Sequence, residues 1–211
     1  MSRLSELLKS VLAGIMVSMG GIAYLSCDNK YIGSLLFSVG LMTIVIFGFN
    51  LYTGKIGYIL SQNKTFLIDT CLSIFGNLAG CLIVGLLKSP VGNVITICEG
   101  KLNKPFLPCL LDAVLCGILI FVCVDMYKKR NTLIGIFICI PAFILCGFEH
   151  SIADMFYVIN ARMFTPKALL LICTAIIGNA IGGLLIPVMQ KIYTPKLSVK
   201  DESAQKESVT I

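Results

Sequence analysis

Long apolar runs separated by short polar segments dominate the chain. Six of them approach the roughly 20 residues that a helix needs to cross about 30 Å of hydrocarbon. They cover approximately residues 11–26, 32–50, 66–88, 105–127, 133–148 and 168–189. This pattern predicts an all-α integral membrane protein with six transmembrane helices, in a single transmembrane domain over residues 1–195.

The second and fifth runs end in segments that mix glycine with polar groups. Leu51-Tyr52-Thr53-Gly54-Lys55 follows the second run, and Gly147-Phe148-Glu149-His150-Ser151-Ile152 follows the fifth. These groups fall where a helix should still be inside the membrane. Non-helical backbone is tolerated at that depth only when it is buried in protein or lines a cavity. We therefore expect the second and fifth helices to be broken beside a permeation pathway.

The two halves of the chain resemble each other. Val11-Leu12-Ala13-Gly14 recurs 103 residues later as Val114-Leu115-Cys116-Gly117, and the segment around Asn77 recurs 102 residues later around Asn179. Thr53 and His150, in the two breaks, are 97 residues apart. We predict two repeats, about 10–90 and 104–190, with three helices each. An odd number of spans inverts the second repeat, which places a substrate site between the halves near the midplane.

Composition agrees with a membrane protein. Hydrophobic residues make up 57% of the chain and charged residues only 13%, against about 25% charged in typical globular proteins. Most of the outer surface must therefore face lipid, which argues against a soluble enzyme or a nucleic-acid-binding protein. The net charge of +6 is better explained by cytoplasmic loops that collect Lys and Arg.

The basic residues also predict the orientation. With both termini on one side, that side holds eleven Lys and Arg and the other side six. The larger group is Arg3, Lys9, Lys55, Lys64, Lys128, Lys129, Arg130, Lys191, Lys196, Lys200 and Lys206. We therefore predict cytoplasmic termini. Residues 196–211 are rich in Ser, Lys and Glu without an apolar face, and we predict a disordered cytoplasmic tail.

The ten cysteines do not suggest metal or redox chemistry. They contain no C-x-x-C pair and lie mostly within apolar runs, where cysteine acts as a small hydrophobe. A zinc site prefers closer pairs, and the single histidine adds little to one. We expect no metal, no cofactor and no enzymatic activity, since a thiol oxidoreductase or intramembrane hydrolase needs a C-x-x-C pair or a cluster of His and acidic residues.

His150 is the main candidate for function. It is the only histidine, and it follows Glu149 within the second break. Ionisable groups at membrane depth are costly and usually face a bundle interior or a water-filled path. Its ordinary pKa lies near neutrality, so it can exchange a proton there. The alternative is a packed histidine that binds a backbone carbonyl.

Three other polar residues could assist. Thr53 offers a hydroxyl that can donate to an anion. Asn77 and Asn179 each lie in a Gly-Asn-x-x-Gly pattern, where they could bind free backbone groups of the breaks or face a pore; close helix packing at the adjacent glycines is an equal alternative. Lys101 and Lys104, outside the fourth span, are either solvated loop residues or attract anions electrostatically.

Two motifs resemble the formate/nitrite transporter family. Gly147-Phe148-Glu149-His150-Ser151-Ile152-Ala153-Asp154-Met155 is similar to its G-F-E-H-S-I-A-N-M signature, and Leu51-Tyr52-Thr53-Gly54 to its L-F-T-[GS] loop. The resemblance extends from about Ala13 to Leu185. It implies an aquaporin-like six-helix protomer with inverted repeats, assembled as a homopentamer with one pore per subunit.

The resemblance also implies residue roles. His150 would be the central pore histidine, with Thr53, Asn179 and Glu149 beside the pathway, and Lys101 would recruit anions. Phe37, Leu41, Leu51, Tyr52 and Phe143 would form apolar constrictions on either side. Two residues depart from the family. Asp154 replaces the Asn of the signature, and Gly117 replaces a usual Asn of the fourth span, which would widen or dry that part of the pathway.

The implied function is a channel or transporter for small monovalent anions of weak acids, linked to protons through His150. Formate is the first expectation, with nitrite and hydrosulfide as alternatives, and the expected place is a bacterial plasma membrane. A water or neutral-solute channel would share the architecture, but the two Asn-Pro-Ala motifs of aquaporins are absent. A purely structural membrane protein would not explain two matched polar breaks.

Overall fold

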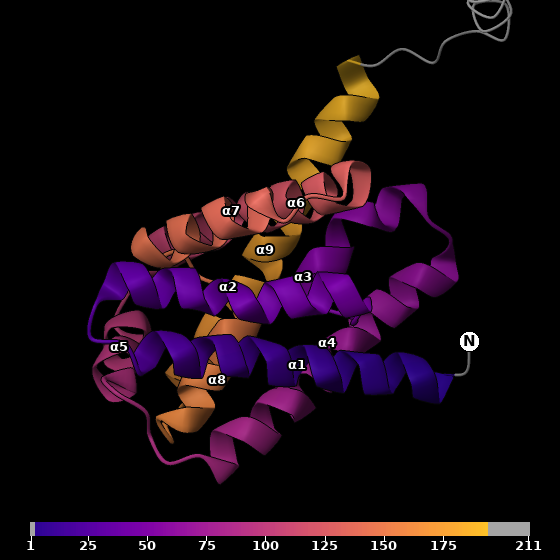
Figure 1. The fold of residues 1–211 in the computed structure, drawn as a ribbon. Helices are drawn as coiled ribbons and strands as arrows, with labels where there is room; N and C mark the ends of the chain where they lie inside the picture. The colour runs from indigo at the N-terminus through magenta and orange to yellow at the C-terminus, as the bar shows by residue number, and fades with distance from the viewer. Residues whose placement is uncertain (1–2, 194–211) are drawn as a thin grey trace, which may run out of the picture.

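The computed structural model describes residues 3–193, and all of the regular structure in that part of the chain is helical (Figure 1). In chain order the helices are α1 (Arg3–Leu25), α2 (Lys30–Phe47), α3 (Tyr52–Lys55), the 3₁₀ helix η1 (Ile56–Ser61), α4 (Lys64–Leu87), α5 (Val94–Leu102), α6 (Phe106–Arg130), α7 (Ile134–Leu145), α8 (Ser151–Asn160) and α9 (Pro166–Tyr193). The predicted tail at 196–211 lies outside the described residues.

Five of these helices, α1, α2, α4, α6 and α9, are long and apolar enough to cross a membrane, and α7 is a shorter apolar helix of 12 residues. Their outward surfaces carry large exposed hydrophobic side chains such as Phe47, Phe75 and Leu87. Such surfaces favour lipid over water. An all-α protein with several helices suited to span a membrane is therefore confirmed.

Backbone geometry explains where α2 and α7 end. Gly48 follows α2 with φ 66° and Gly147 follows α7 with φ 70°, a left-handed conformation in which glycine has no steric cost. The chain resumes as a helix only at Tyr52 and Ser151. Each interruption thus turns the chain inside the bundle and leaves several backbone groups without helical partners. We call residues 48–51 the first break and residues 146–150 the second break.

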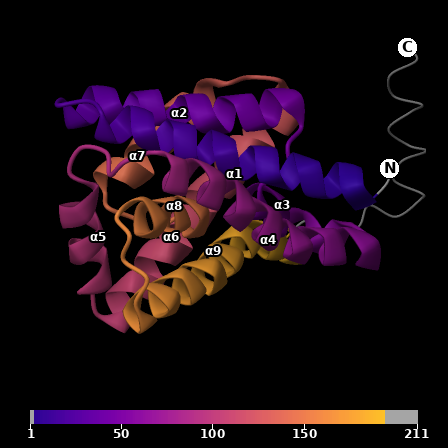
Figure 2. The same ribbon diagram turned by 90° about the horizontal axis from the view of Figure 1, so that it is seen from below.

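The packing pattern occurs twice. α1 packs against α2 and α4, and α6 packs against α7 and α9. α2 contacts α7, α8 packs against α4, and η1 packs against α9, so the segment after each break lies on the long helix of the other half. α5 and the N-terminal end of α1 lie at opposite ends of the bundle (Figures 1 and 2). This packing therefore places both breaks inside the helix bundle.

Candidate functional site

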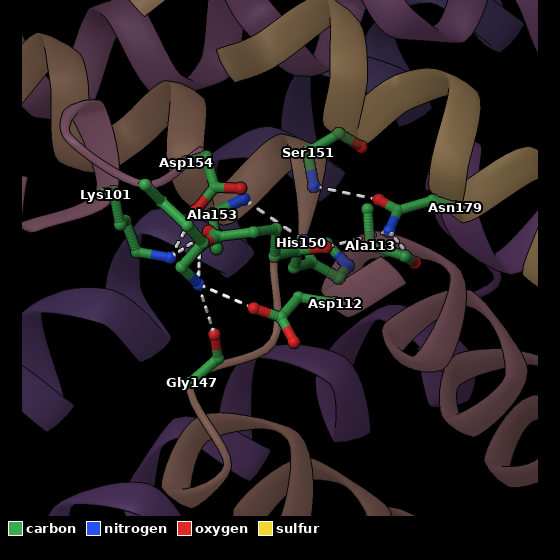
Figure 3. Close-up of polar contacts among 11 residues, drawn as sticks. Lys101, Asp112, Ala113, Gly147, His150, Ser151, Ala153, Asp154 and Asn179 are labelled. Carbon is green, nitrogen blue, oxygen red and sulfur yellow. Dashed lines mark hydrogen bonds and ion pairs between the residues drawn. The ribbon is translucent and has the colours of Figure 1, made fainter. Parts of the chain in front are cut away.

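Asn179 holds the second break. Its side-chain amide donates to the carbonyls of Glu149 and Ala113, both at 2.8 Å, and its oxygen accepts the backbone N–H of Ser151 at 2.8 Å (Figure 3). Asn179 is fully buried. Its side chain thus supplies partners for backbone groups that the interruption of the helix leaves free.

Asn77 holds the first break in the same way. Its amide donates to the carbonyls of Ser10 at 2.8 Å and Asn50 at 2.9 Å, and its oxygen accepts the N–H of Tyr52 at 3.0 Å. Residues 50 and 52 therefore correspond to residues 149 and 151, an offset of 99. Each asparagine links a break to the first long helix of its own half.

This correspondence changes one inference from the sequence. The spacing of 97 matches Thr53 with His150, but the hydrogen bonds place Leu51 in the position equivalent to His150. Thr53 is instead a direct partner, because its Oγ1 lies 3.0 Å from His150 Nε2. The two residues come from different halves of the chain and meet at the middle of the bundle, with exposures of only 2% and 3%.

The contacts of His150 fix its neutral tautomer. Nδ1 accepts the backbone N–H of Ala153 at 3.1 Å and so caps the start of α8. Since a nitrogen that accepts from an amide carries no proton, the proton of the neutral ring is on Nε2 and is donated to Thr53 Oγ1. The Thr53 hydroxyl keeps its own hydrogen, which it can donate to another acceptor.

Aromatic rings pack around this pair. The ring centroids of Phe143 and His150 are 5.7 Å apart, with an angle of 26° between the ring planes. Phe37 meets Phe143 edge-on, with the ring centroids 5.8 Å apart. Two of the predicted constriction residues therefore lie in this cluster of rings, with Phe143 against His150 and Phe37 against Phe143. Tyr52 is also buried, but its hydroxyl donates to the carbonyl of Ile176.

A cavity of about 360 Å³ lies on the α5 side of His150. His150, Phe143, Glu149, Asp154 and Lys101 are among the residues that line it. The Lys101 ammonium forms ion pairs with Glu149 and, at 2.9 Å, with Asp154 (Figure 3). Burial alone would lower the pKa of Lys101, but the carboxylates of Asp154 and Glu149 outweigh it and hold that pKa above its ordinary value. Lys101 is therefore charged.

Lys104 extends the same cluster. Its ammonium binds Glu149, Asp112 at 2.7 Å and the carbonyl of Gly147 at 3.0 Å. Burial lowers its pKa, but hydrogen bonds to Asp112 and Glu149 raise the pKa above its usual value overall. Glu149 thus receives a lysine on each carboxylate oxygen, and both lysines are held beside the cavity rather than solvated in a loop.

A second cavity, of about 290 Å³, lies on the other side of the pair. Leu41 and Leu51 line it with Gly54, Lys55 and Lys128, among others. His150 lines the first cavity, and Leu51 and Gly54, which flank Thr53 in the chain, line the second. The Thr53–His150 hydrogen bond therefore lies between two cavities. Tyr52 and Phe37 are not among the described residues that line either one.

The sequence does not group three members of the charged cluster with Lys101 and Glu149. Lys104 has two interpretations from the sequence, Asp154 stands out only as a departure from the signature, and Asp112 carries no signal of its own. The signal was present in the helical spacing, because Asp154 lies four residues after His150, on the same face of the helix that begins there.

The expected widening at Gly117 is wrong. A Cβ at this position would lie 2.4 Å from the carbonyl oxygen of Asn179, closer than atoms can approach. α6 and α9 meet there backbone to backbone, as α1 and α4 do at Gly14, where a Cβ would lie 2.1 Å from the carbonyl oxygen of Asn77. Gly117 therefore allows close packing and opens no space in the pathway.

Known proteins resemble this chain in sequence. The family model for formate/nitrite transporters matches residues 1–193. The formate channel FocB of Escherichia coli is 25% identical over 78% of this chain and 70% of its own length, and the formate channel BtFdhC of Bacillus thuringiensis is 30% identical over 72% and 68%.

Two solved structures share the fold. A pentameric formate channel with formate bound superposes with a TM-score of 0.72 at 23% identity, covering 90% of this chain and 96% of that one. An FNT family ion channel superposes with a TM-score of 0.79 at 21% identity, covering 90% of each chain. The resemblance inferred from the two motifs is confirmed, and the chain belongs to the formate/nitrite transporter family.

Proposed function

We propose that this protein conducts small monovalent anions of weak acids across a membrane, with formate as the principal substrate and nitrite or hydrosulfide as alternatives. The observation that carries the proposal is the buried Thr53–His150 pair between two cavities that open toward opposite ends of the bundle. A permeating anion would pass from one cavity to the other at this pair.

The proposed architecture is two inverted three-helix repeats in a homopentamer with one pore per subunit. The duplicated hydrogen bonds of Asn77 and Asn179 support the repeat, and the fold shared with a pentameric formate channel supports the assembly. Lys55 and Lys128 line one cavity and Lys101 and Lys104 the other, the same grouping that the count of basic residues uses to place both termini in the cytoplasm. A bacterial plasma membrane is the proposed location.

The proposed pathway begins at the charged cluster. An anion that enters the α5-side cavity is attracted by Lys101 and Lys104 and then meets Phe143 and Phe37, where it must lose water. A bare charge crossing apolar rings loses several kcal/mol of hydration, whereas the neutral acid does not. The anion therefore takes up a proton before it passes.

His150 and Thr53 would position the substrate during this step. His150 Nε2–H donates to Thr53 Oγ1 at the boundary between the cavities, and an anion that separated the two would accept from both Nε2–H and the Thr53 hydroxyl. In this role His150 organises the proton transfer or the water that carries it. Leu41 and Leu51 then form the apolar passage into the second cavity.

Uptake into liposomes that contain the purified protein tests this function. Formate, nitrite, hydrosulfide, acetate and lactate would be compared across pH, with water permeability measured in parallel. We expect formate to enter faster than through protein-free liposomes. If none of the anions enters faster, the proposal is lost, and water flux alone would favour a neutral-solute channel. A stable monomer by native mass measurement in mild detergent would contradict the pentamer.

A further inference from the structure

Asp154 is a buried carboxylate that lines the α5-side cavity without adequate partners. Its exposure is 1%. Lys101 Nζ approaches one of its oxygens at 2.9 Å, but neither oxygen has a hydrogen bond of acceptable geometry with the described residues. Glu149, by contrast, is bound by both Lys101 and Lys104. The ionised form of Asp154 is therefore less stabilised than that of Glu149, because it has fewer favourable contacts.

The cluster around Asp154 contains more carboxylates than lysines. Lys101 and Lys104 carry two positive charges, and Glu149, Asp154 and Asp112 carry three negative charges when all are ionised. The Lys101 ammonium is then paired with two carboxylates, and an incoming anion meets a net negative cluster. If Asp154 takes up one proton as the anion arrives, the total charge of the cluster and its ligand is unchanged. Protonation also gives Asp154 an O–H that can donate to the anion.

The other groups that face Asp154 do not offer an equivalent change near neutral pH. They are Lys101 and Cys98 on α5, Glu149 in the second break, Tyr157 on α8, and Cys109 and Cys116 on α6. Burial raises the pKa of the Cys98 thiol to about 11, and thiols and phenols ordinarily ionise above neutrality. Asp154 is therefore the group whose charge can change with the arrival of substrate.

His150 is less suited to take up this proton. Its Nδ1 accepts the N–H of Ala153, and its Nε2 already carries the proton that faces Thr53. A second proton would have to go on Nδ1, which would break the cap of α8 and leave the Ala153 N–H without its acceptor. Asp154 needs no such rearrangement, because it lines the cavity, neither of its oxygens accepts a hydrogen bond from the described residues, and only one of them pairs with Lys101.

We propose that Asp154 determines when an anion can enter the pathway: ionised, it occupies Lys101 and excludes the anion, and protonated, it releases Lys101 to bind the anion. In this step one proton from the solvent binds one Asp154 oxygen while one anion binds the Lys101 ammonium, so the net charge does not change. The inference rests on the proposed transport of weak-acid anions, and it makes Asp154 the residue through which pH controls access from the α5 side.

Formate uptake by Asp154→Asn tests it, with Asp112→Asn as the matched control. Both substitutions remove one carboxylate from the same cluster, but among the described residues Asp112 forms an ion pair with Lys104 and not with Lys101. At each external pH the uptake rate of the variant would be divided by that of the wild-type protein. This ratio cancels the change with pH in the fraction of formate that is present as formic acid in solution. For Asp154→Asn we expect a ratio near one at low pH that rises about tenfold per pH unit above the midpoint, as a single-proton requirement dictates. For Asp112→Asn the ratio should stay flat.

A flat ratio for Asp154→Asn, or the same slope in both variants, would overturn the inference while leaving transport intact. Failure of the wild-type protein to exceed protein-free liposomes would instead remove the proposed function itself. A second measurement needs no variant. Sodium formate added to the wild-type protein in weakly buffered detergent solution should raise the pH as protons are taken up, approaching one per subunit. Formate binding without proton uptake would also contradict the role of Asp154.

Discussion

The first and second breaks are held by matching hydrogen bonds from Asn77 and Asn179, yet they present different side chains. Where the second break has Glu149 and His150, the first has Asn50 and Leu51. Lysine accompanies both, since Lys55 donates to Asn50 at 3.1 Å and Lys101 binds Glu149. The hydrogen-bonded frame that Asn77 or Asn179 forms around each break is therefore duplicated, whereas of the two breaks only the second carries ionisable side chains.

The equivalence of the two frames can be tested by removing each asparagine. Asn77→Ala and Asn179→Ala each leave two buried backbone groups of a break without partners, and each such group costs about 1–3 kcal/mol. We expect both to lower the free energy of unfolding by at least about 2 kcal/mol, seen as an earlier thermal transition in detergent. Asn103→Ala, in the exposed turn after α5, is the control and should change little. A large effect of one asparagine with a negligible effect of the other would contradict two equivalent frames.

The close helix contacts behind each frame provide a second comparison. Ala in place of Gly14 or Gly117 forces a methyl group against a backbone carbonyl oxygen of the paired helix, and such overpacking costs about 1–3 kcal/mol. We expect similar losses for the two variants in the same thermal measurement. Gly100→Ala on α5 is the matched control, because nothing lies within 4 Å of its added Cβ. It should be neutral or slightly stabilising. A neutral Gly117→Ala would show that α6 and α9 can separate.

The sequence predicts the frame well and the charged cluster poorly, for a physical reason. Apolar runs and the spaced Gly-Asn-x-x-Gly patterns are local features, so they indicate the helices and the breaks; for Asn77 and Asn179 they leave open whether the amides bind free backbone groups or face a pore, or whether the pattern serves close helix packing. The meeting of Lys104 with Glu149, 45 residues away along the chain, depends on how α5 folds back over the cavity. No periodicity reports that.

Residue spacing also misled in one respect. The interval between Thr53 and His150 suggested equivalent positions, but the hydrogen bonds match Leu51 with His150. Similarly, the sequence shows only that Gly117 lacks the amide side chain usual in the family. The close approach of α6 to the Asn179 backbone shows why a side chain does not fit there. Both corrections require knowing which backbone lies opposite each residue.

The chemical difference between the breaks can be tested at His150. In His150→Asn the new side-chain oxygen can still accept the Ala153 N–H at the start of α8, because Asn is a good N-cap residue, but it is too short to reach Thr53. We expect normal thermal stability and formate uptake reduced about tenfold, equivalent to about 1.4 kcal/mol. Asn103→Ala again serves as control for the flux. Unchanged uptake would mean that the imidazole acts only as a cap.

Thr53 provides the smallest and most specific test, because it belongs to the first half and acts on the second. Thr53→Val keeps the shape of the side chain and removes its hydroxyl, so His150 Nε2–H loses its acceptor. A buried hydrogen bond contributes about 1 kcal/mol, and formate uptake should therefore fall about fivefold. Thr53→Ser restores the hydroxyl and should recover most of the rate. If Val and Ser behave alike, the hydroxyl contributes nothing to conduction, and the hydrogen bond between Thr53 and His150 has only a structural role.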